Sequence, residues 1–182
     1  RVFISKGMAS MGFGLPSSIG AAIAKKHSMV TTFTGDGGFQ LNIQELQTVK
    51  HHKLPIKIFV VSNEGYHAIR VTQKGYFKKN YVGSTIKSGV SLPNLKEISR
   101  AYGISYTSIK NNKEVNKKLK EIYSNINAQI IEVFTDPIKQ LEPKLGSIIK
   151  SDGSMVSRPL EDLVPLLDRG LLKKFMYIDL ID

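Results

Sequence analysis

The sequence has no cysteine and no tryptophan, and acidic residues are few. Without cysteine, the 182 residues cannot form disulfide bridges, thiolate metal sites or cysteine nucleophiles. This absence fits a reducing compartment, and we expect a cytoplasmic protein. No apolar run approaches the roughly 18 residues that a membrane-spanning helix needs, so we expect no membrane contact.

Basic residues outnumber acidic ones by 26 to 15, which gives a formal charge of +11. Such a surplus raises the question of nucleic acid or another polyanion. The lysines are scattered, however, and the densest group, at 110–120, lies in a polar stretch typical of an exposed helix. We therefore expect no nucleic-acid partner, although a small anion such as a diphosphate suits this charge. A nucleic-acid module, the alternative, predicts a steep salt dependence of DNA binding.

Short apolar segments alternate with amphipathic ones along the first 135 residues. The pattern predicts strands at 30–34, 56–62, 104–109 and 129–134, and helices at 16–26, 40–52, 95–102 and 112–125. Residues 67–90 show no regular pattern. This alternation predicts an α/β fold with three layers, in which helices cover both faces of a parallel sheet.

The character of the sequence changes near residue 136, where proline and glycine punctuate a polar stretch. We expect a domain at 1–135 and a C-terminal tail at 136–182 that packs on it, with a short helix at about 160–168. The chain opens with Arg1 rather than methionine. We therefore expect a fragment cut from a longer polypeptide, or a processed chain.

Two polar turns follow neighbouring predicted strands. Asp36 is flanked by Gly35, Gly37 and Gly38, and Asn63 follows the next strand 27 residues later (63 − 36). In a strand–helix–strand unit, both turns fall at the carboxyl edge of the sheet. Carboxylate and amide oxygens suit Mg²⁺, and glycine amides before a helix favour a phosphate. The pattern predicts a diphosphate bridged by Mg²⁺.

Two other interpretations of these turns are open. They could be plain strand-to-helix connections. Alternatively, a dinucleotide-binding domain would use Val2–Ser5 as its first strand, Gly12 and Gly14 as the phosphate turn and Asp36 as the ribose acid. Ser17 stands at the third glycine position of that motif. A domain of this kind would bind its ligand without Mg²⁺.

The same residues resemble a known family. Gly35-Asp36-Gly37 followed by Asn63 is similar to the thiamin diphosphate motif. The segments 7–16 and 35–48 resemble the acetolactate synthase branch of those enzymes. The resemblance covers about residues 5–135. It implies the C-terminal diphosphate-binding domain of an acetolactate synthase-type large subunit, with the thiamin diphosphate-binding fold.

The resemblance also implies roles for individual residues. Asp36, the side-chain oxygen of Asn63 and the Gly65 carbonyl would bind Mg²⁺, while Gly37 and Gly38 would approach the diphosphate. On the pyrimidine side, Met11 would lie under the bent cofactor, and the Ala9 carbonyl would accept a hydrogen bond from the aminopyrimidine. Further cofactor-binding positions are Ser10, Gly35, Tyr66 and His67, and His67 is expected to face the substrate.

The activity that the resemblance implies is decarboxylation of a 2-oxo acid with carboligation, by a transferase or lyase. The alternative is a simple decarboxylase or another carbon–carbon lyase on the same cofactor. Ser62 and the segment 65–69 depart from the commonest family pattern, which leaves the substrate open. The family also needs a glutamate on a pyrimidine-binding domain of the same or a partner subunit. No segment here resembles that domain, so we expect an incomplete active site, in a fragment of a longer chain or in one subunit of a split enzyme. We also expect a homo-oligomeric full-length enzyme and any FAD outside this chain.

Overall fold

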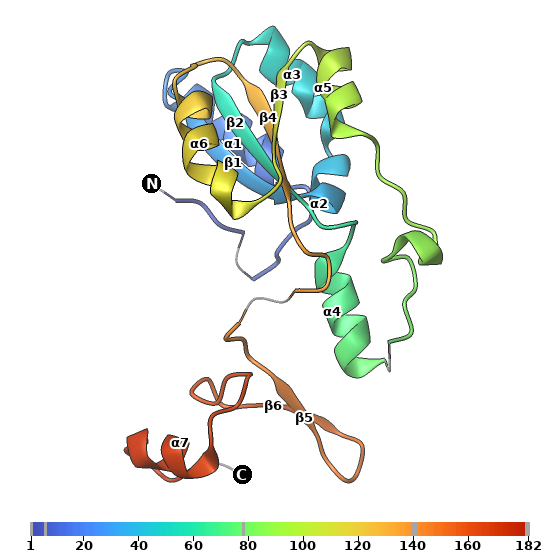
Figure 1. The fold of residues 1–182 in the computed structure, drawn as a ribbon, viewed down its shortest axis with the longest axis vertical. Coiled ribbons are helices and arrows are strands. Elements are labelled where there is room, and N and C mark those ends of the chain that lie inside the picture. Colours follow the sequence, from blue (N-terminus) through green and yellow to red (C-terminus); the bar gives the residue numbers. More distant parts are fainter. Residues whose placement is uncertain (1, 6, 78, 140–141, 181–182) are drawn as a thin grey trace. The chain divides into compact units, whose positions relative to one another are not determined.

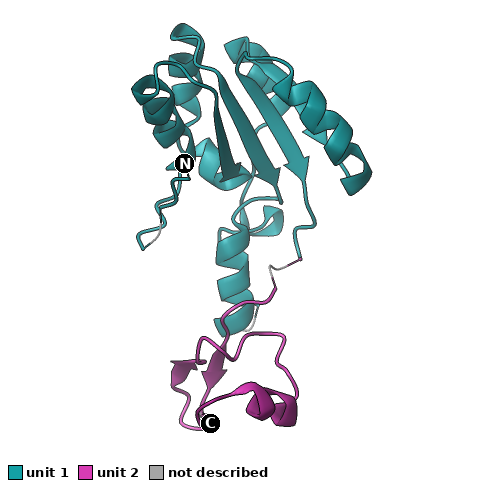
Figure 2. Ribbon diagram, turned by 90° about the vertical axis from the view of Figure 1, so that its left-hand side faces the viewer, with its two compact units in different colours: residues 1–138 teal, residues 139–182 magenta. Residues whose placement is uncertain are grey.

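The computed structural model describes residues 2–5, 7–77, 79–139 and 142–180. The chain divides into two compact units, residues 1–138 and residues 139–182 (Figure 2). The predicted division at 135/136 lies close to this boundary, and the packing of the tail on the domain stays a prediction. Arg1, on which the expectation of a fragment depends, lies outside the described residues.

The first unit alternates strands and helices along the chain (Figure 1). Its strands are β1 (Val30–Gly35), β2 (Ile56–Ser62), β3 (Ser105–Ile109) and β4 (Gln129–Phe134). Its α-helices are α1 (Gly14–Ala24), α2 (Asp36–Gln40), α3 (Leu46–His51), α4 (His67–Tyr76), α5 (Leu95–Tyr102) and α6 (Val115–Tyr123). Short 3₁₀ helices lie at Ile43–Glu45, Ile86–Ser88 and Asn112–Glu114.

The four strands form one parallel sheet in the order β1-β2-β4-β3. β2 is central and pairs with β1 from Val30↔Ile56 to Gly35↔Val61. β4 is the other central strand and pairs with both β2 and β3. All four strands therefore end at the same edge, which places the turns after β1 and β2 side by side.

Helices cover both faces of the sheet, which confirms the predicted three-layer fold. Side chains of α1, α3 and α5 pack on one face around Ile56, Ile58 and Val60 of β2, all fully buried. On the other face, Ile122 of α6 packs with Phe59 and other apolar strand residues. Because successive strand residues point to opposite faces, β2 serves both cores and is apolar almost throughout.

Two helical predictions for the first unit need correction. The helix expected at 40–52 begins earlier, as α2 at Asp36, and reaches His51 through a 3₁₀ turn. Gly37 and Gly38 therefore lie inside α2 and not in a loop before the helix. α4 was not predicted, because none of its residues is buried and residues 67–90 show no regular apolar pattern in the sequence.

The second unit is small and irregular. It contains an antiparallel hairpin, β5 (Ser147–Ile149) with β6 (Met155–Ser157), followed by α7 (Arg169–Phe175). The helix predicted at about 160–168 is wrong, since the helix of this region starts at Arg169, where Asp168 caps it by accepting a hydrogen bond from Leu171 N. The buried Asp162 joins Arg158 and Arg169 in ion pairs of 2.7 and 2.6 Å.

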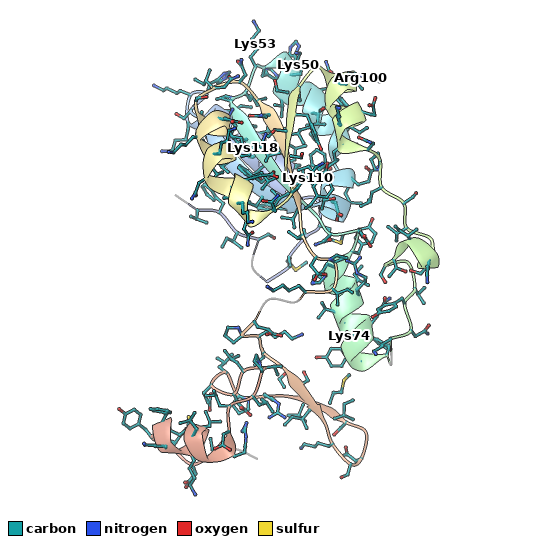
Figure 3. The ribbon with its side chains drawn as sticks, viewed as in Figure 1. Lys50, Lys53, Lys74, Arg100, Lys110 and Lys118 are labelled. Carbon is teal, nitrogen blue, oxygen red and sulfur yellow. The ribbon has the colours of Figure 1, made fainter. Side chains whose placement is uncertain are left out.

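Basic side chains are spread over several elements of the first unit (Figure 3). The labelled ones come from α3 and the turn after it, from α4, α5 and α6, and from the residue that follows β3.

Among the residues that the structure describes, no helix is both long and apolar enough to cross a membrane.

Candidate functional site

The turns after β1 and β2 meet at the carboxyl edge of the sheet. Asp36 is the first residue after β1, and Asn63 is the first after β2. The strands are neighbours, as the predicted site requires. The structure therefore brings together two residues that lie 27 positions apart in the sequence.

The Asp36 carboxylate is buried and receives three backbone hydrogen bonds. Its Oδ1 accepts from Gly37 N at 2.8 Å. Its Oδ2 accepts from Asn63 N at 2.9 Å and from Gly65 N at 3.1 Å. None of the ion pairs formed by the described residues includes Asp36. Backbone N–H groups, not a basic side chain, therefore stabilise this anion.

The Asn63–Gly65 turn is folded tightly around that carboxylate. Glu64 and Gly65 have positive φ values of 63° and 107°, a conformation that glycine accepts and other residues adopt at a cost. The side-chain oxygen Oδ1 of Asn63 is buried and has no hydrogen-bond partner among the residues that the structure describes. A buried polar oxygen without a donor is rare and costs free energy, which makes it a candidate ligand atom.

Two glycines allow close packing at the site. A Cβ on Gly37 would lie 2.5 and 2.6 Å from ring atoms of Tyr66, the residue that precedes α4. A Cβ on Gly12 would lie 2.4 Å from Nδ2 of Asn42, which donates to the Gly12 carbonyl at 2.9 Å. Only glycine fits either position without displacing its neighbour. The Asn42 contact fixes the loop before α1 to the segment after α2.

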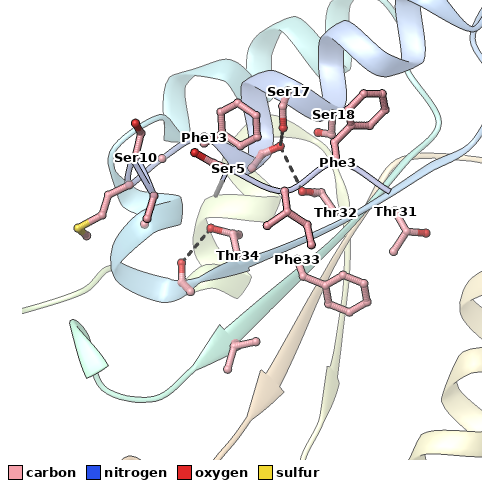
Figure 4. Close-up of a pocket in the computed structure, with 18 of the residues that line it drawn as sticks. Phe3, Ser5, Ser10, Phe13, Ser17, Ser18, Thr31, Thr32, Phe33 and Thr34 are labelled. Carbon is pink, nitrogen blue, oxygen red and sulfur yellow. Dashed lines mark hydrogen bonds between the residues drawn. The ribbon is translucent and has the colours of Figure 1, made fainter. Parts of the chain in front are cut away.

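One cavity of about 1190 Å³ joins these turns to the loop before α1. Its lining includes all the predicted cofactor-binding residues except Asp36: Ala9, Ser10, Met11, Gly35, Gly37, Gly38, Asn63, Gly65, Tyr66 and His67. β1 and the start of α1 form one wall, where Ser17 and Thr32 both donate to the Gly14 carbonyl at 2.9 and 3.2 Å (Figure 4). Residues from three distant segments thus share one space.

The loop before α1 presents its residues openly to this cavity. Met11 is 49% exposed, and Ala9 has a positive φ of 47°. Ala9 and Ser10 are exposed as well. The sequence placed these residues at the cofactor by resemblance alone, and the structure places them on the lining of the same cavity as the Asp36 turn.

His67 begins α4 and also lines the cavity. Its Nδ1 lies 3.1 Å from the carbonyl oxygen of Pro137, which follows β4. Because a carbonyl only accepts, Nδ1 carries the hydrogen in this contact, and Nε2 of the neutral ring is an acceptor. The ring orientation is therefore set by a segment 70 residues away.

Sequence reasoning missed Arg70, Asn42 and Pro137. Arg70 donates to backbone carbonyls of the Asn63–Gly65 turn and of two other segments. In the sequence, the one signal that could have revealed Arg70 is its position, seven residues after Asn63. Asn42 and Pro137 act through contacts between distant segments, which no local pattern reveals.

The oxygen atoms at this edge fit a hard cation such as Mg²⁺. Within the described part of the chain, no three His, Cys, Asp or Glu side chains gather as a metal-binding group. The candidate set therefore consists of one carboxylate, the unpartnered Oδ1 of Asn63 and a backbone carbonyl, that of Gly65, which also accepts from His67 N at 2.9 Å. Such a set leaves positions for phosphate oxygens and water.

The dinucleotide-binding alternative fails on its first element. The described residues Val2–Ser5 form no strand, and they are not part of the sheet. The segment with Gly12 and Gly14 consequently follows a loop, whereas the dinucleotide motif requires a strand directly before it.

Comparison with known proteins assigns the family. The family described as "Thiamine pyrophosphate enzyme, C-terminal TPP binding domain" matches residues 1–133. The chain is 33% identical over 142 residues to the acetolactate synthase large subunit of Cyanidium caldarium, covering 78% of this chain and 24% of that protein. It is 31% identical over 139 residues to the acetolactate synthase isozyme 2 large subunit of Escherichia coli (strain K12), covering 76% of this chain and 25% of that protein.

A solved structure shares the fold. It is the thiamine diphosphate-dependent 4-hydroxybenzoylformate decarboxylase of Rhodococcus jostii RHA1, with a TM-score of 0.61 and 24% identity, covering 71% of this chain and 24% of that one. The chain spans about a quarter of the length of the relatives it matches. On these matches, the chain belongs to the thiamine pyrophosphate enzymes as a C-terminal TPP-binding domain of the acetolactate synthase type.

Proposed function

We propose that the cavity holds thiamin diphosphate and that Asp36, the side chain of Asn63 and the Gly65 carbonyl bind its Mg²⁺. The observation that carries this proposal is Oδ1 of Asn63, a buried oxygen without a donor beside a buried carboxylate without a cationic side-chain partner among the described residues. A cation bound there would give Oδ1 of Asn63 a partner and the Asp36 carboxylate a positive counter-charge.

The other lining residues receive roles from their positions. Gly37 and Gly38 lie at the start of α2, where the backbone approaches the cavity without side chains and suits a diphosphate. The Ala9 carbonyl and the Met11 side chain would hold the pyrimidine end, on the loop before α1. When bound, thiamin diphosphate supplies a nucleophilic carbon for chemistry at carbonyl groups.

For the whole enzyme, we propose decarboxylation of a 2-oxo acid followed by carboligation, the activity of an acetolactate synthase. The names of the similar large subunits support it. His67 would face the substrate, because it lines the cavity and because Pro137 holds Nδ1 and so directs Nε2 as an acceptor. A decarboxylase or another lyase would differ after the shared first step, and product analysis of the full-length enzyme with pyruvate separates them.

Catalysis would require more than this chain. The pyrimidine-contacting glutamate would lie on another domain, of the same or a partner subunit, in a cytoplasmic homo-oligomer. Any FAD would bind that remainder of the enzyme. The present chain would hold the cofactor by its diphosphate and metal but would not turn over substrate alone.

Calorimetric titration of thiamin diphosphate into the chain, with Mg²⁺ and with EDTA, tests the cofactor site. We expect binding that depends on Mg²⁺. Asp36→Ala should abolish it but also leaves three backbone N–H groups without their acceptor, so it can unfold the edge of the sheet.

Asn63→Ala is the sharper variant. Because Oδ1 has no partner to lose, we expect the free energy of unfolding to change by less than about 1 kcal/mol. The Mg²⁺-dependent affinity should nevertheless fall at least about tenfold. Asn116→Ala, on the exposed side of α6, is the matched control. Equal binding in EDTA, no binding to the folded chain, or wild-type affinity in Asn63→Ala would contradict the proposal.

A further inference from the structure

The Arg70 guanidinium gathers four backbone carbonyls. Nη1 donates to the carbonyls of Glu64 and Ser84, each at 2.9 Å. Nη2 donates to the carbonyls of Asn63 and, at 3.4 Å, of Pro137. The two terminal nitrogens carry four hydrogens, so every one of them has a carbonyl partner.

These contacts connect three segments that are far apart in the sequence. Asn63 and Glu64 belong to the turn after β2, Ser84 precedes the 3₁₀ helix at Ile86–Ser88, and Pro137 follows β4. Arg70 itself lies in the second turn of α4. One side chain therefore fixes the ends of two neighbouring strands and a long connection relative to one another.

Arg70 uses its charge on neutral groups. None of the ion pairs among the described residues includes it. Its side chain is half-buried and does not line the cavity. A carboxylate that neutralised it would compete with the carbonyls for the planar fork of donors. The arrangement thus favours holding backbone over binding an anion.

The Asn63–Gly65 turn is consequently held by two opposite charges. The Asp36 carboxylate accepts from the N–H groups of Asn63 and Gly65, and the Arg70 guanidinium donates to the carbonyls of Asn63 and Glu64. Both contacts act on peptide groups that flank the positive φ values of Glu64 and Gly65. Charged partners of this kind offset a backbone conformation that is costly by itself.

We propose that Arg70 is the positioning residue of the metal-binding turn and fixes where Oδ1 of Asn63 lies. This inference deepens the proposed function and rests on it for the identity of the ligand. Arg70 touches neither the cavity nor the expected cation. It acts through the two carbonyls of the turn, so the fork geometry matters and the positive charge alone does not suffice.

Three variants of the chain separate geometry, charge and stability. Arg70→Lys keeps the charge but replaces the planar fork with one ammonium group. Arg70→Met removes both. Lys74→Met removes a charge from an exposed position one turn further along α4 and is the matched control.

Amide hydrogen exchange of the chain without cofactor, resolved by residue with NMR, is the primary measurement. We expect the amides of Asn63 and Gly65 to exchange at least about tenfold faster in Arg70→Lys and Arg70→Met, beyond any change in the core amides of β2. Lys74→Met should leave them unchanged. The Mg²⁺-dependent affinity for thiamin diphosphate should fall about 10- to 100-fold in both Arg70 variants.

The outcomes are distinct. A uniform rise in exchange across the first unit would show a merely structural role and overturn the inference, as would wild-type behaviour of Arg70→Lys. If the wild-type chain shows no Mg²⁺-dependent binding while the turn loosens in both Arg70 variants, the proposed function fails and the positioning role stands. If wild type binds and the Arg70 variants match it in exchange and affinity, the positioning role fails alone.

Discussion

At the scale of single residues, a half-buried hydroxyl beside a carboxylate makes one contact sensitive to pH. Tyr106 of β3 donates to Oε2 of Glu132 in the neighbouring strand β4 at 2.5 Å. Burial, followed by the hydrogen bond to Glu132 and the charge of its carboxylate, raises the pKa of Tyr106 from 10.0 to about 12. The folded chain therefore keeps this proton at a pH where the unfolded chain releases it.

Loss of stability at alkaline pH follows from that raised pKa. Between pH 10 and about 12 the folded chain binds more protons at Tyr106 than the unfolded chain, so the free energy of unfolding falls as pH rises. We expect the free energy of unfolding of wild type, relative to that of Tyr106→Phe, to be constant well below pH 10 and to fall as the pH rises to about 12. Denaturant titrations across this interval measure it, and a difference independent of pH would contradict it. Glu132→Gln should lower the pKa of Tyr106 only in part.

Among the elements, the strands and capped helices follow the sequence closely. β2, β4 and α5 have the predicted bounds. In α5, Asn94 accepts hydrogen bonds from the N–H groups of Lys96 and Glu97, and Gly103 ends the helix with a φ of 61°. Apolar runs and caps are local properties, so a sequence pattern is sufficient to locate them.

Other elements depend on contacts that the sequence does not display. α4 lacks a buried face and is joined to neighbouring segments through Arg70 and through Gln73, which donates to the Val82 carbonyl. At the start of α2, the Tyr66 ring packs closely against Gly37, a contact between segments that no local pattern reveals. Asp36, Asn63 and the glycines beside them were predicted from their positions at strand ends, and Ala9, Ser10 and Met11 by resemblance. Arg70 and Asn42 act between segments and were missed.

A glycine substitution tests the close packing at the start of α2. In Gly37→Ala the new Cβ would overlap the Tyr66 ring, so we expect a loss of about 1–3 kcal/mol in the free energy of unfolding and weaker cofactor binding. Gly20→Ala, in α1 with open space around the new Cβ, should instead stabilise by up to about 1 kcal/mol. Denaturant unfolding compares the two. Equal effects of both substitutions would refute this account.

At the scale of the whole molecule, the two units obtain their stability from different sources. The first has two apolar cores around a sheet. The second has few buried apolar side chains among its described residues, and its buried charge, Asp162, binds two arginines. A unit of this size buries little apolar surface, so the ion pairs carry more weight there.

Asp162→Ala should therefore loosen the second unit selectively. It leaves Arg158 and Arg169 without their shared partner, and we expect that unit to lose about 2–3 kcal/mol, less than a fully buried pair because Arg169 is half exposed. Amide exchange should rise in residues 142–180 and stay unchanged in the first unit. Glu161→Ala, its exposed neighbour, is the control. Equal loosening of both units would argue against separate sources of stability.

The strand order has a consequence for synthesis on the ribosome. β1, β2 and β3 all precede β4 in the chain, yet β4 lies between β2 and β3 and makes the only pairing of β3 within the described sheet. A nascent chain that stops before Gln129 can pair β1 with β2, but β3 has no neighbour and the inner edge of β2 stays open. The sheet is therefore completed only when β4, its last strand in the sequence, has left the ribosome. Until then, chaperones or misplaced strands can bind the unpaired strand edges.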